Sequence, residues 1–266
     1  MLKVRIIPAI LFSYGWLVQT YKFDNFRFLG TPDKTAERLS AWGSDELIFI
    51  DISRGRKLQL RTDIKNKSSL SFLNHLKKIS ELINIPLTVG GKIKTLKNIN
   101  DRLIRGADKV VINSQFHIDN NFVKKASKEF GSQSIVACVD VKKINNTYRP
   151  VYNSGTEVSN YNLKDWINYL TENGAGEIMI NNVDLDGTLK GFDLKLAKLV
   201  KSIIKKPLIF CGGAGNAKDF LKLYKKTKIN AICGANFFNY HEQSVYLLKN
   251  LLYKKSVPVR RPYFYE

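Results

Sequence analysis

Short apolar segments rich in Val and Ile alternate along the chain with longer amphipathic segments. The longer segments repeat apolar residues at spacings of three and four, which predicts helices over 71–83, 120–130, 163–174, 192–203 and 216–227. The short ones have the composition of buried strands, and there are eight of them: 4–11, 46–52, 85–90, 109–113, 134–141, 177–183, 207–212 and 230–235. Strands that alternate with helices in this number predict a parallel (β/α)8 barrel, or TIM barrel.

The barrel is expected to form one domain over residues 1–266, because no linker rich in Pro, Gly or Ser divides the chain. One added element is expected. The polar segment 142–157 follows the fifth strand and predicts a β-hairpin that turns at Asn145 and Asn146. The hairpin would lie on the barrel face that carries active sites.

The two halves of the chain resemble each other. Residues 87–116 align without a gap with residues 209–238, at an offset of 122. At an offset of 129 the first strand aligns with the fifth, which places Leu11 against Asp140. Two half-barrel repeats are the simplest explanation of this pattern.

The chain carries 43 Lys and Arg against 23 Asp and Glu, a formal net charge of +20. This charge would suit a nucleic acid, an anionic membrane or a phosphorylated substrate. The lysines occur in nearly every polar segment, and no zinc-finger, helix-turn-helix or RNP pattern is present. We therefore expect a lysine-rich solvated surface that attracts phosphate, and neither nucleic acid nor membrane as a partner.

The N-terminal apolar stretch is too short, and too interrupted by Pro8, Ser13 and Gly15, to span a bilayer, so a cytoplasmic protein is expected. No metal and no cofactor are expected either. The Cys and His residues lack the spacing of metal-ligand sets; they are Cys138, Cys211, Cys233, His75, His117 and His241.

Each repeat places a Gly-Gly pair directly after a strand. Glycines at this position let backbone N–H groups approach an anion closely. The pattern predicts two phosphate cradles: a first cradle of Gly90, Gly91, Asn113 and Ser114, and a second cradle of Gly212, Gly213, Ala235 and Asn236. For either pair alone a tight turn explains the glycines equally well, but their duplication favours phosphate.

Seven motifs extend over nearly the whole chain: RIIP, ELIFIDI, LTVGGKI, RGADKVVIN, VDVK, GAGEIMINNVDLDGT and CGGAGNAKDF. In this order they resemble the cyclase subunit (HisF) family of imidazole glycerol phosphate synthase. The resemblance implies a (β/α)8 barrel that receives ammonia from a glutaminase (HisH-like) partner through the barrel core. It also implies that the ammonia is used at the C-terminal face, on a substrate with two phosphates.

The resemblance also implies roles for individual residues. A charged ammonia gate at the N-terminal barrel face corresponds to Arg5, Glu46, Lys109 and Glu177, with the glutaminase docking near Asp108. A salt-bridged plug that only stabilises the barrel is the alternative function of these four residues. At the opposite face the resemblance implies a catalytic Asp140 and substrate contacts from Asp51, Asp186 and Gly187.

The chain departs from the family pattern at the C-terminal face. The family has a second catalytic aspartate on the first strand, where this chain has Leu11. Gln19 stands in place of a lysine near a substrate phosphate, and Lys92 in place of the third glycine of the first cradle. Asn181 and Cys211 replace smaller hydroxyl residues.

Three functions are consistent with this pattern of retained and lost residues. The first, which we favour from the sequence, is a divergent paralogue that supplies ammonia for amidation of a surface-polysaccharide sugar, forming an acetamidino group with a separate sugar amidotransferase. The second is an authentic cyclase of histidine biosynthesis with an atypical active site. The third is a non-catalytic scaffold that binds a phosphosugar through the two cradles.

Overall fold

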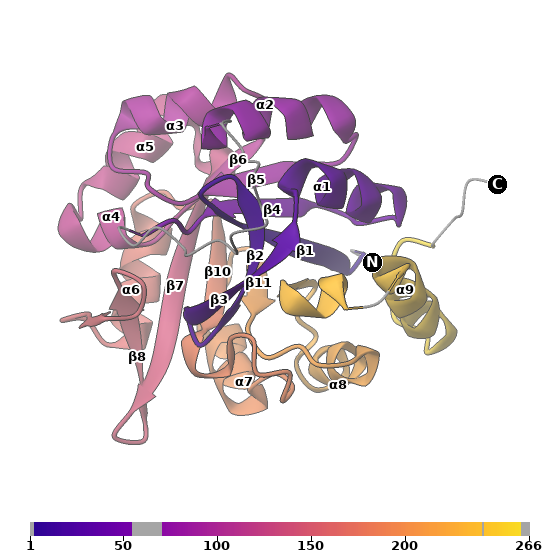
Figure 1. Ribbon diagram of the computed structural model, residues 1–266. Helices are drawn as coiled ribbons and strands as arrows, with labels where there is room; N and C mark the ends of the chain where they lie inside the picture. Colours follow the sequence, from indigo (N-terminus) through magenta and orange to yellow (C-terminus); the bar gives the residue numbers. More distant parts are fainter. Residues whose placement is uncertain (1–2, 55–70, 241, 262–266) are drawn as a thin grey trace.

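The computed structural model describes residues 3–54, 71–240 and 242–261. Within these ranges, eight parallel strands close into a barrel (Figure 1). In barrel order they are β1 (Arg5–Ser13), β4 (Leu47–Asp51), β5 (Leu87–Gly90), β6 (Lys109–Ile112), β7 (Ile135–Ile144), β10 (Glu177–Asn182), β11 (Leu208–Cys211) and β12 (Ala231–Gly234), and β12 pairs with β1. The prediction of a TIM barrel is confirmed.

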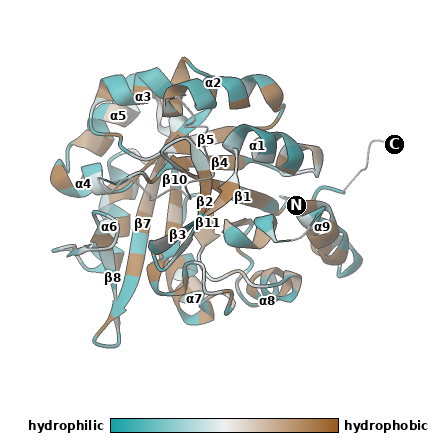
Figure 2. Cartoon of the chain, viewed as in Figure 1, coloured by the Kyte–Doolittle hydropathy of each residue, from teal (hydrophilic) through white to brown (hydrophobic). Residues whose placement is uncertain are grey.

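Helices surround the barrel. They are α1 (Pro32–Ala41), α2 (Phe72–Leu82), α3 (Leu96–Leu103), α4 (Ser114–Ile118), α5 (Phe122–Phe130), α6 (Leu163–Glu172), α7 (Leu194–Ile203), α8 (Ala217–Thr227) and α9 (Ser244–Lys254). Figure 2 shows mostly hydrophobic strands inside and helices of mixed hydropathy outside. The mixed helices pack their apolar positions on the strands, as the predicted spacings of three and four require.

Side-chain caps fix where several helices begin, and therefore where the loops of the active face end. Asn216 and Asp219 form a reciprocal capping box at the start of α8. At α7, the Asp193 carboxylate accepts hydrogen bonds from the backbone N–H groups of Lys195 and Leu196.

Two hairpins extend the barrel at its C-terminal face. The first continues β7 through a two-residue turn into β8 (Thr147–Tyr152), which also pairs with β9 (Glu157–Val158). Asn145 and Asn146 form the turn with φ angles of 47° and 61°, a conformation that asparagine tolerates well.

The second hairpin was not expected from the sequence. The segment after β1, for which the sequence pattern predicts no strand, forms β2 (Trp16–Tyr21) and β3 (Asp24–Gly30). β2 pairs antiparallel with β1 and β3 pairs with β2, so this hairpin folds over the barrel mouth.

The buried side chains form two apolar clusters. The larger one lies between the strands and the helices. The smaller one occupies the inside of the barrel and contains Ile7, Ala9, Ile48, Val111, Val136, Met179, Ile209, Cys211, Ala231 and Cys233. The barrel interior is therefore a packed apolar core between two polar ends.

In the ranges that the structure describes, no helix has the length and hydropathy needed to cross a membrane.

A buried ion pair joins the last helix to the start of the barrel. Lys249 of α9 lies with its Nζ 2.9 Å from Asp45 Oδ1, and the other Asp45 oxygen accepts the N–H of Ile6 at 2.8 Å. Burial lowers the pKa of Lys249, although the charge of Asp45 opposes this effect.

We expect Lys249→Met to lower the free energy of unfolding by about 3 kcal/mol, because the buried Asp45 carboxylate would lose its close partner and keep only the exposed Arg260, whose Nε lies 3.7 Å away. Urea denaturation at pH 7 measures this change. Lys254→Met, at an exposed position of the same helix, is the matched control and should change stability by less than about 0.5 kcal/mol. Equal effects of the two substitutions would contradict the prediction.

Candidate functional site

A cavity of about 520 Å³ opens at the C-terminal mouth of the barrel. Seven of the residues predicted for the site line it: Asp51, Gly91, Asn113, Ser114, Asp140, Asp186 and Ala235. Four residues at which the chain departs from the family pattern line it too: Leu11, Lys92, Asn181 and Cys211. The other predicted residues of this face, all of them described, are absent from the lining: Gly90, Gly187, Gly212, Gly213 and Asn236.

Asp140 lies within β7, where this strand begins to pair with β8, and two amides hold its carboxylate. Its Oδ2 accepts a hydrogen bond from Asn113 Nδ2 at 2.6 Å, and its Oδ1 accepts one from Asn181 Nδ2 at 3.1 Å. Burial raises the pKa of Asp140 to about 6, although the two amide donors act in the opposite direction. A carboxyl group with this pKa can both give and take a proton near neutral pH, which suits a general acid or base.

The first cradle is open to the cavity. Gly91 has a φ of 85°, and a Cβ there would lie 2.0 Å from the backbone oxygen of Asp51. Only glycine allows this close approach of the ends of β4 and β5. Across the cradle, the Oγ of Ser114 accepts a hydrogen bond from the N–H of Asn153 at 3.0 Å, which ties the β8 hairpin to α4.

The second cradle is covered by neighbouring loops. The N–H of Gly191 donates to the Gly213 carbonyl at 2.8 Å, and Asn236 Nδ2 donates to the Thr20 carbonyl at 2.8 Å. A Cβ on Gly187 would lie 1.9 Å from that same Thr20 oxygen. The β2–β3 hairpin and the loop that contains Gly187 therefore lie over these glycines, and of the second cradle Ala235 lines the cavity.

Asp186 fastens the β2–β3 hairpin. Its Oδ2 accepts hydrogen bonds from Thr20 Oγ1 at 2.7 Å and from the N–H of Phe23 at 3.2 Å. Burial raises the pKa of Asp186. Gln19 points away from the cavity, because its Oε1 accepts a hydrogen bond from the hydroxyl of Tyr240 at 2.8 Å. This contact between distant segments had no signal in the sequence.

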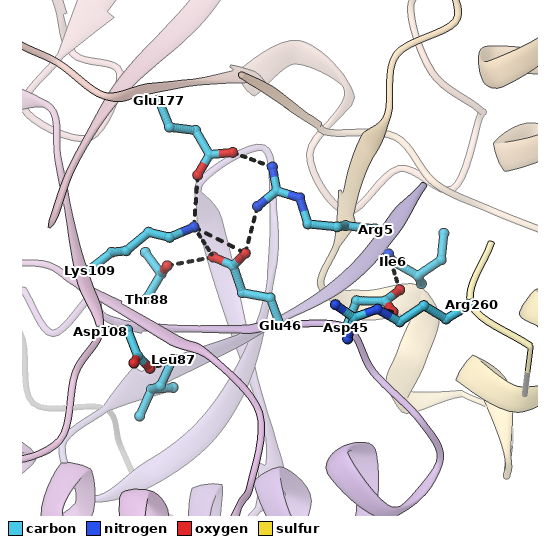
Figure 3. Close-up of polar contacts among 10 residues, drawn as sticks. All are labelled: Arg5, Ile6, Asp45, Glu46, Leu87, Thr88, Asp108, Lys109, Glu177 and Arg260. Carbon is cyan, nitrogen blue, oxygen red and sulfur yellow. Dashed lines mark hydrogen bonds and ion pairs between the residues drawn. The ribbon is translucent and has the colours of Figure 1, made fainter. Parts of the chain in front are cut away.

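The four residues assigned to the gate meet in one ring at the N-terminal end of the barrel (Figure 3). Arg5 donates to Glu46 Oε2 at 2.8 Å and also to Glu177. Lys109 Nζ lies 3.3 Å from Glu46 and 3.0 Å from Glu177, and Thr88 donates to Glu46 at 2.6 Å. Each charge therefore has two partners of opposite charge.

In the ring, Glu177 and Arg5 are held in their charged forms although burial opposes charge on both. Burial by itself would raise the pKa of Glu177, but the hydrogen bonds and charges of Arg5 and Lys109 outweigh it and lower that pKa. The two carboxylates raise the pKa of Arg5 against the opposing effect of burial. Beside the ring, Asp108 Oδ2 accepts the N–H of Leu87 at 2.8 Å, so this carboxylate stabilises the strand end at the face assigned to the glutaminase.

In the part of the chain that the structure describes, no group of three or more Cys, His, Asp or Glu residues is arranged to hold a metal ion. His241 lies outside the described residues.

The fold and the site together define a (β/α)8-barrel protein with a carboxylate-containing ligand cavity at one end and a closed ring of charge at the other. A family model described as "Histidine biosynthesis protein" matches residues 5–243. The chain belongs to this family.

Relatives extend over the same length as this chain. A protein of Natranaerobius thermophilus is 35% identical over 98% of this chain and 100% of its own length. A protein of Metallosphaera sedula is 33% identical over 96% of this chain and 98% of its own. A third, from Prochlorococcus marinus strain MIT 9301, is 35% identical over 98% of this chain and 99% of its own length. Each is named imidazole glycerol phosphate synthase subunit HisF.

Proposed function

We propose that this chain is a cytoplasmic, ammonia-using synthase subunit of the imidazole glycerol phosphate synthase type, and that a glutaminase subunit docks on its N-terminal face. The observation that carries the proposal is the closed ring of Arg5, Glu46, Lys109 and Glu177. In the proposal Asp140 is the catalytic acid or base, and the first cradle with Asp51 binds a phosphorylated ligand.

The barrel interior supports this function because it favours neutral ammonia over ammonium. Between the ring and the cavity the interior side chains are apolar, among them Ile7, Ile48 and Met179. An unpaired charge entering such an environment loses its hydration and is strongly disfavoured, whereas an uncharged molecule is not. Ammonia released beside the ring would therefore cross without becoming protonated.

Two acceptors of the ammonia are candidates. The names of the relatives favour the cyclase reaction of imidazole glycerol phosphate synthase over the second candidate. The retained Asp140, with its raised pKa, agrees with this reaction.

The second candidate is amidation of a surface-polysaccharide sugar together with a separate sugar amidotransferase. Leu11 favours it, because this side chain lines the cavity where the family pattern implies a proton-transferring aspartate. A barrel that still conducts ammonia but has lost this group would serve a different acceptor.

Opening the ring tests the proposal. Lys109→Ala should reduce several-fold the amount of aminated product formed per glutamate released, because ammonia would escape at an entrance whose charges no longer pair. The reaction with added ammonium salt should continue at the wild-type rate. The assay uses the protein reconstituted with its glutaminase and measures glutamate and aminated product together.

Glu177→Ala should have the same effect, since it removes a partner of both Arg5 and Lys109. Lys218→Ala, on the exposed start of α8, is the matched control and should leave the ratio of product to glutamate unchanged. Unchanged ratios in both ring variants, or failure of any glutaminase to bind this protein, would mean that the ring is only a structural plug.

A further inference from the structure

We infer that Lys92 exchanges between two anionic partners, the Asp51 carboxylate and a phosphate group of the ligand, and that phosphate binding therefore frees Asp51 for proton transfer. The inference rests on the proposed function, because it assumes a phosphorylated ligand in the cavity.

The backbone places Lys92 directly beside Asp51. Residues Ile50 and Gly90 are paired in the parallel register of β4 and β5, so the chain segments that follow them leave the barrel side by side. Gly91 then passes against the backbone of Asp51, and Lys92 follows with a φ of 53°. A left-handed conformation is unfavourable for a residue other than glycine, and such residues cluster at functional sites.

The ion pair between Lys92 and Asp51 is weak enough to exchange. Lys92 Nζ lies 3.3 Å from Asp51 Oδ2, and the Lys92 side chain is 51% exposed, whereas the Asp51 side chain is only 8% exposed. Because the ammonium group of Lys92 stays in contact with solvent, water screens its attraction to the carboxylate, and the cation can leave without being buried elsewhere. The other oxygen, Asp51 Oδ1, accepts hydrogen bonds from the N–H and the hydroxyl of Ser53 at 2.9 and 2.6 Å, which hold the carboxylate in place when Lys92 leaves.

A phosphate in the first cradle would compete well for Lys92. A phosphate monoester carries nearly two negative charges at neutral pH, against one on a carboxylate. Lys92 lines the cavity together with Gly91 and Ser114 of the cradle, so its ammonium group can reach an anion bound there.

A second cation, buried behind the cradle, keeps this region positive. Arg102 of α3 is 5% exposed and donates hydrogen bonds to the carbonyls of Gly91 at 2.6 Å and Asn98 at 2.7 Å. Among the described residues, no carboxylate forms an ion pair with its guanidinium group. Its charge is therefore available to the field in the cradle whichever partner Lys92 takes.

The internal repeat shows that the ion pair belongs to the first cradle alone. At the offset of 122, Lys92 aligns with Ala214. Glu46 aligns with Glu177 at an offset of 131, and at this offset Asp51 aligns with Asn182. Both positions of the second half are neutral. The cation and the carboxylate are thus present together in one half and missing together from the other.

Freeing Asp51 would supply a second proton-transfer group in the cavity, beside Asp140. Leu11 cannot exchange a proton, and one oxygen of Asp186 is occupied by Thr20 and Phe23 of the hairpin. Asp51, once unpaired, can accept a proton from an N–H or O–H group of the ligand and return it. Ligand binding and the availability of the base are then coupled through Lys92.

Binding of inorganic phosphate to the protein, measured by calorimetry at pH 7.5, tests the first part of the inference. Lys92→Met should weaken binding about tenfold, because a charge-assisted hydrogen bond to the anion is lost. Lys97→Met, an exposed lysine on neighbouring α3, is the matched control and should bind phosphate like the wild type. Lys92→Gly removes the charge and also gives the anion freer access to the backbone. If this variant bound phosphate as tightly as the wild type or more tightly, the inference would be overturned.

A double-mutant cycle tests the exchange itself. Asp51→Asn should tighten phosphate binding several-fold in the wild type, where it removes the competing partner of Lys92, and clearly less in the Lys92→Met background, where only charge repulsion is relieved. Equal tightening in both backgrounds would show that Lys92 does not change partners. These measurements need neither glutaminase nor acceptor, so their failure would leave the coupling assay with Lys109→Ala unaffected.

Discussion

Supplied with ammonium and the two-phosphate substrate of imidazole glycerol phosphate synthases, the purified protein is expected to form the imidazole product about 10²–10⁴ times more slowly than a relative with aspartate at the position of Leu11. The side chain of Leu11 lines the cavity and cannot exchange a proton. Product formation at saturating ammonium, without glutaminase, measures the step that depends on this side chain alone.

Leu11→Asp should raise the rate of product formation at least tenfold over the wild type. Leu11→Asn should leave the rate unchanged, because the asparagine side chain has the shape of aspartate but does not titrate near neutral pH. Wild-type turnover near that of a typical relative would assign the chain to the cyclase reaction. No recovery in Leu11→Asp would leave Gln19 and Lys92, which also depart from the family pattern, as further obstacles to the reaction.

The barrel was predictable because its signal is local and repeated. Strands buried on both faces read as continuous apolar runs, and each run that was expected overlaps a barrel strand. The hairpin at Asn145 and Asn146 was predictable for the same reason, since two asparagines in a polar turn suffice to specify it.

The covering of the C-terminal face was not predictable, because long-range contacts decide it. The β2–β3 hairpin lacks a strong turn signal, and it is held in place by Asp186 and Asn236, which lie more than 160 positions away. The same contacts place the hairpin over Gly212 and Gly213 of the second cradle, which do not line the cavity. Equal Gly-Gly pairs in the sequence thus have unequal access to the cavity in the structure.

The gate illustrates the limit of inference from resemblance. Family motifs identified Arg5, Glu46, Lys109 and Glu177, but only closure of the barrel brings four separate strand ends into one ring of alternating charge. The contribution of Thr88, whose hydroxyl supports Glu46, became visible only in the folded structure.

Asp140→Asn should reduce the ammonium-dependent reaction by about 10²–10⁴, because it removes the general acid or base while keeping the size of the side chain. The variant is expected to fold. Among the residues that the structure describes, Asn113 Oδ1 and Asn181 Oδ1 have no hydrogen-bond partner, so either amide can rotate and accept a hydrogen bond from the new side chain. The Leu11→Asp protein is the parent in which imidazole formation provides the readout.

The same substitution should change how stability depends on pH. Burial raises the pKa of Asp140 to about 6 in the folded protein, against 3.8 for an ordinary aspartate, so between these values the folded state binds more protons than the unfolded state. The contribution of Asp140 to the stability of the wild type therefore falls as the pH rises from about 4 to about 6, by about 3 kcal/mol in all.

Asp140→Asn has no such group to ionise. Its free energy of unfolding should equal that of the wild type near pH 4 and exceed it by up to about 3 kcal/mol at pH 8, as measured by urea denaturation across this range. Glu81→Gln, at an exposed position of α2, is the matched control and should show no widening difference. A constant difference between Asp140→Asn and the wild type from pH 4 to pH 8 would mean that Asp140 ionises as readily as a solvated aspartate. The retained carboxylate would then not have the raised pKa that suits proton transfer at neutral pH.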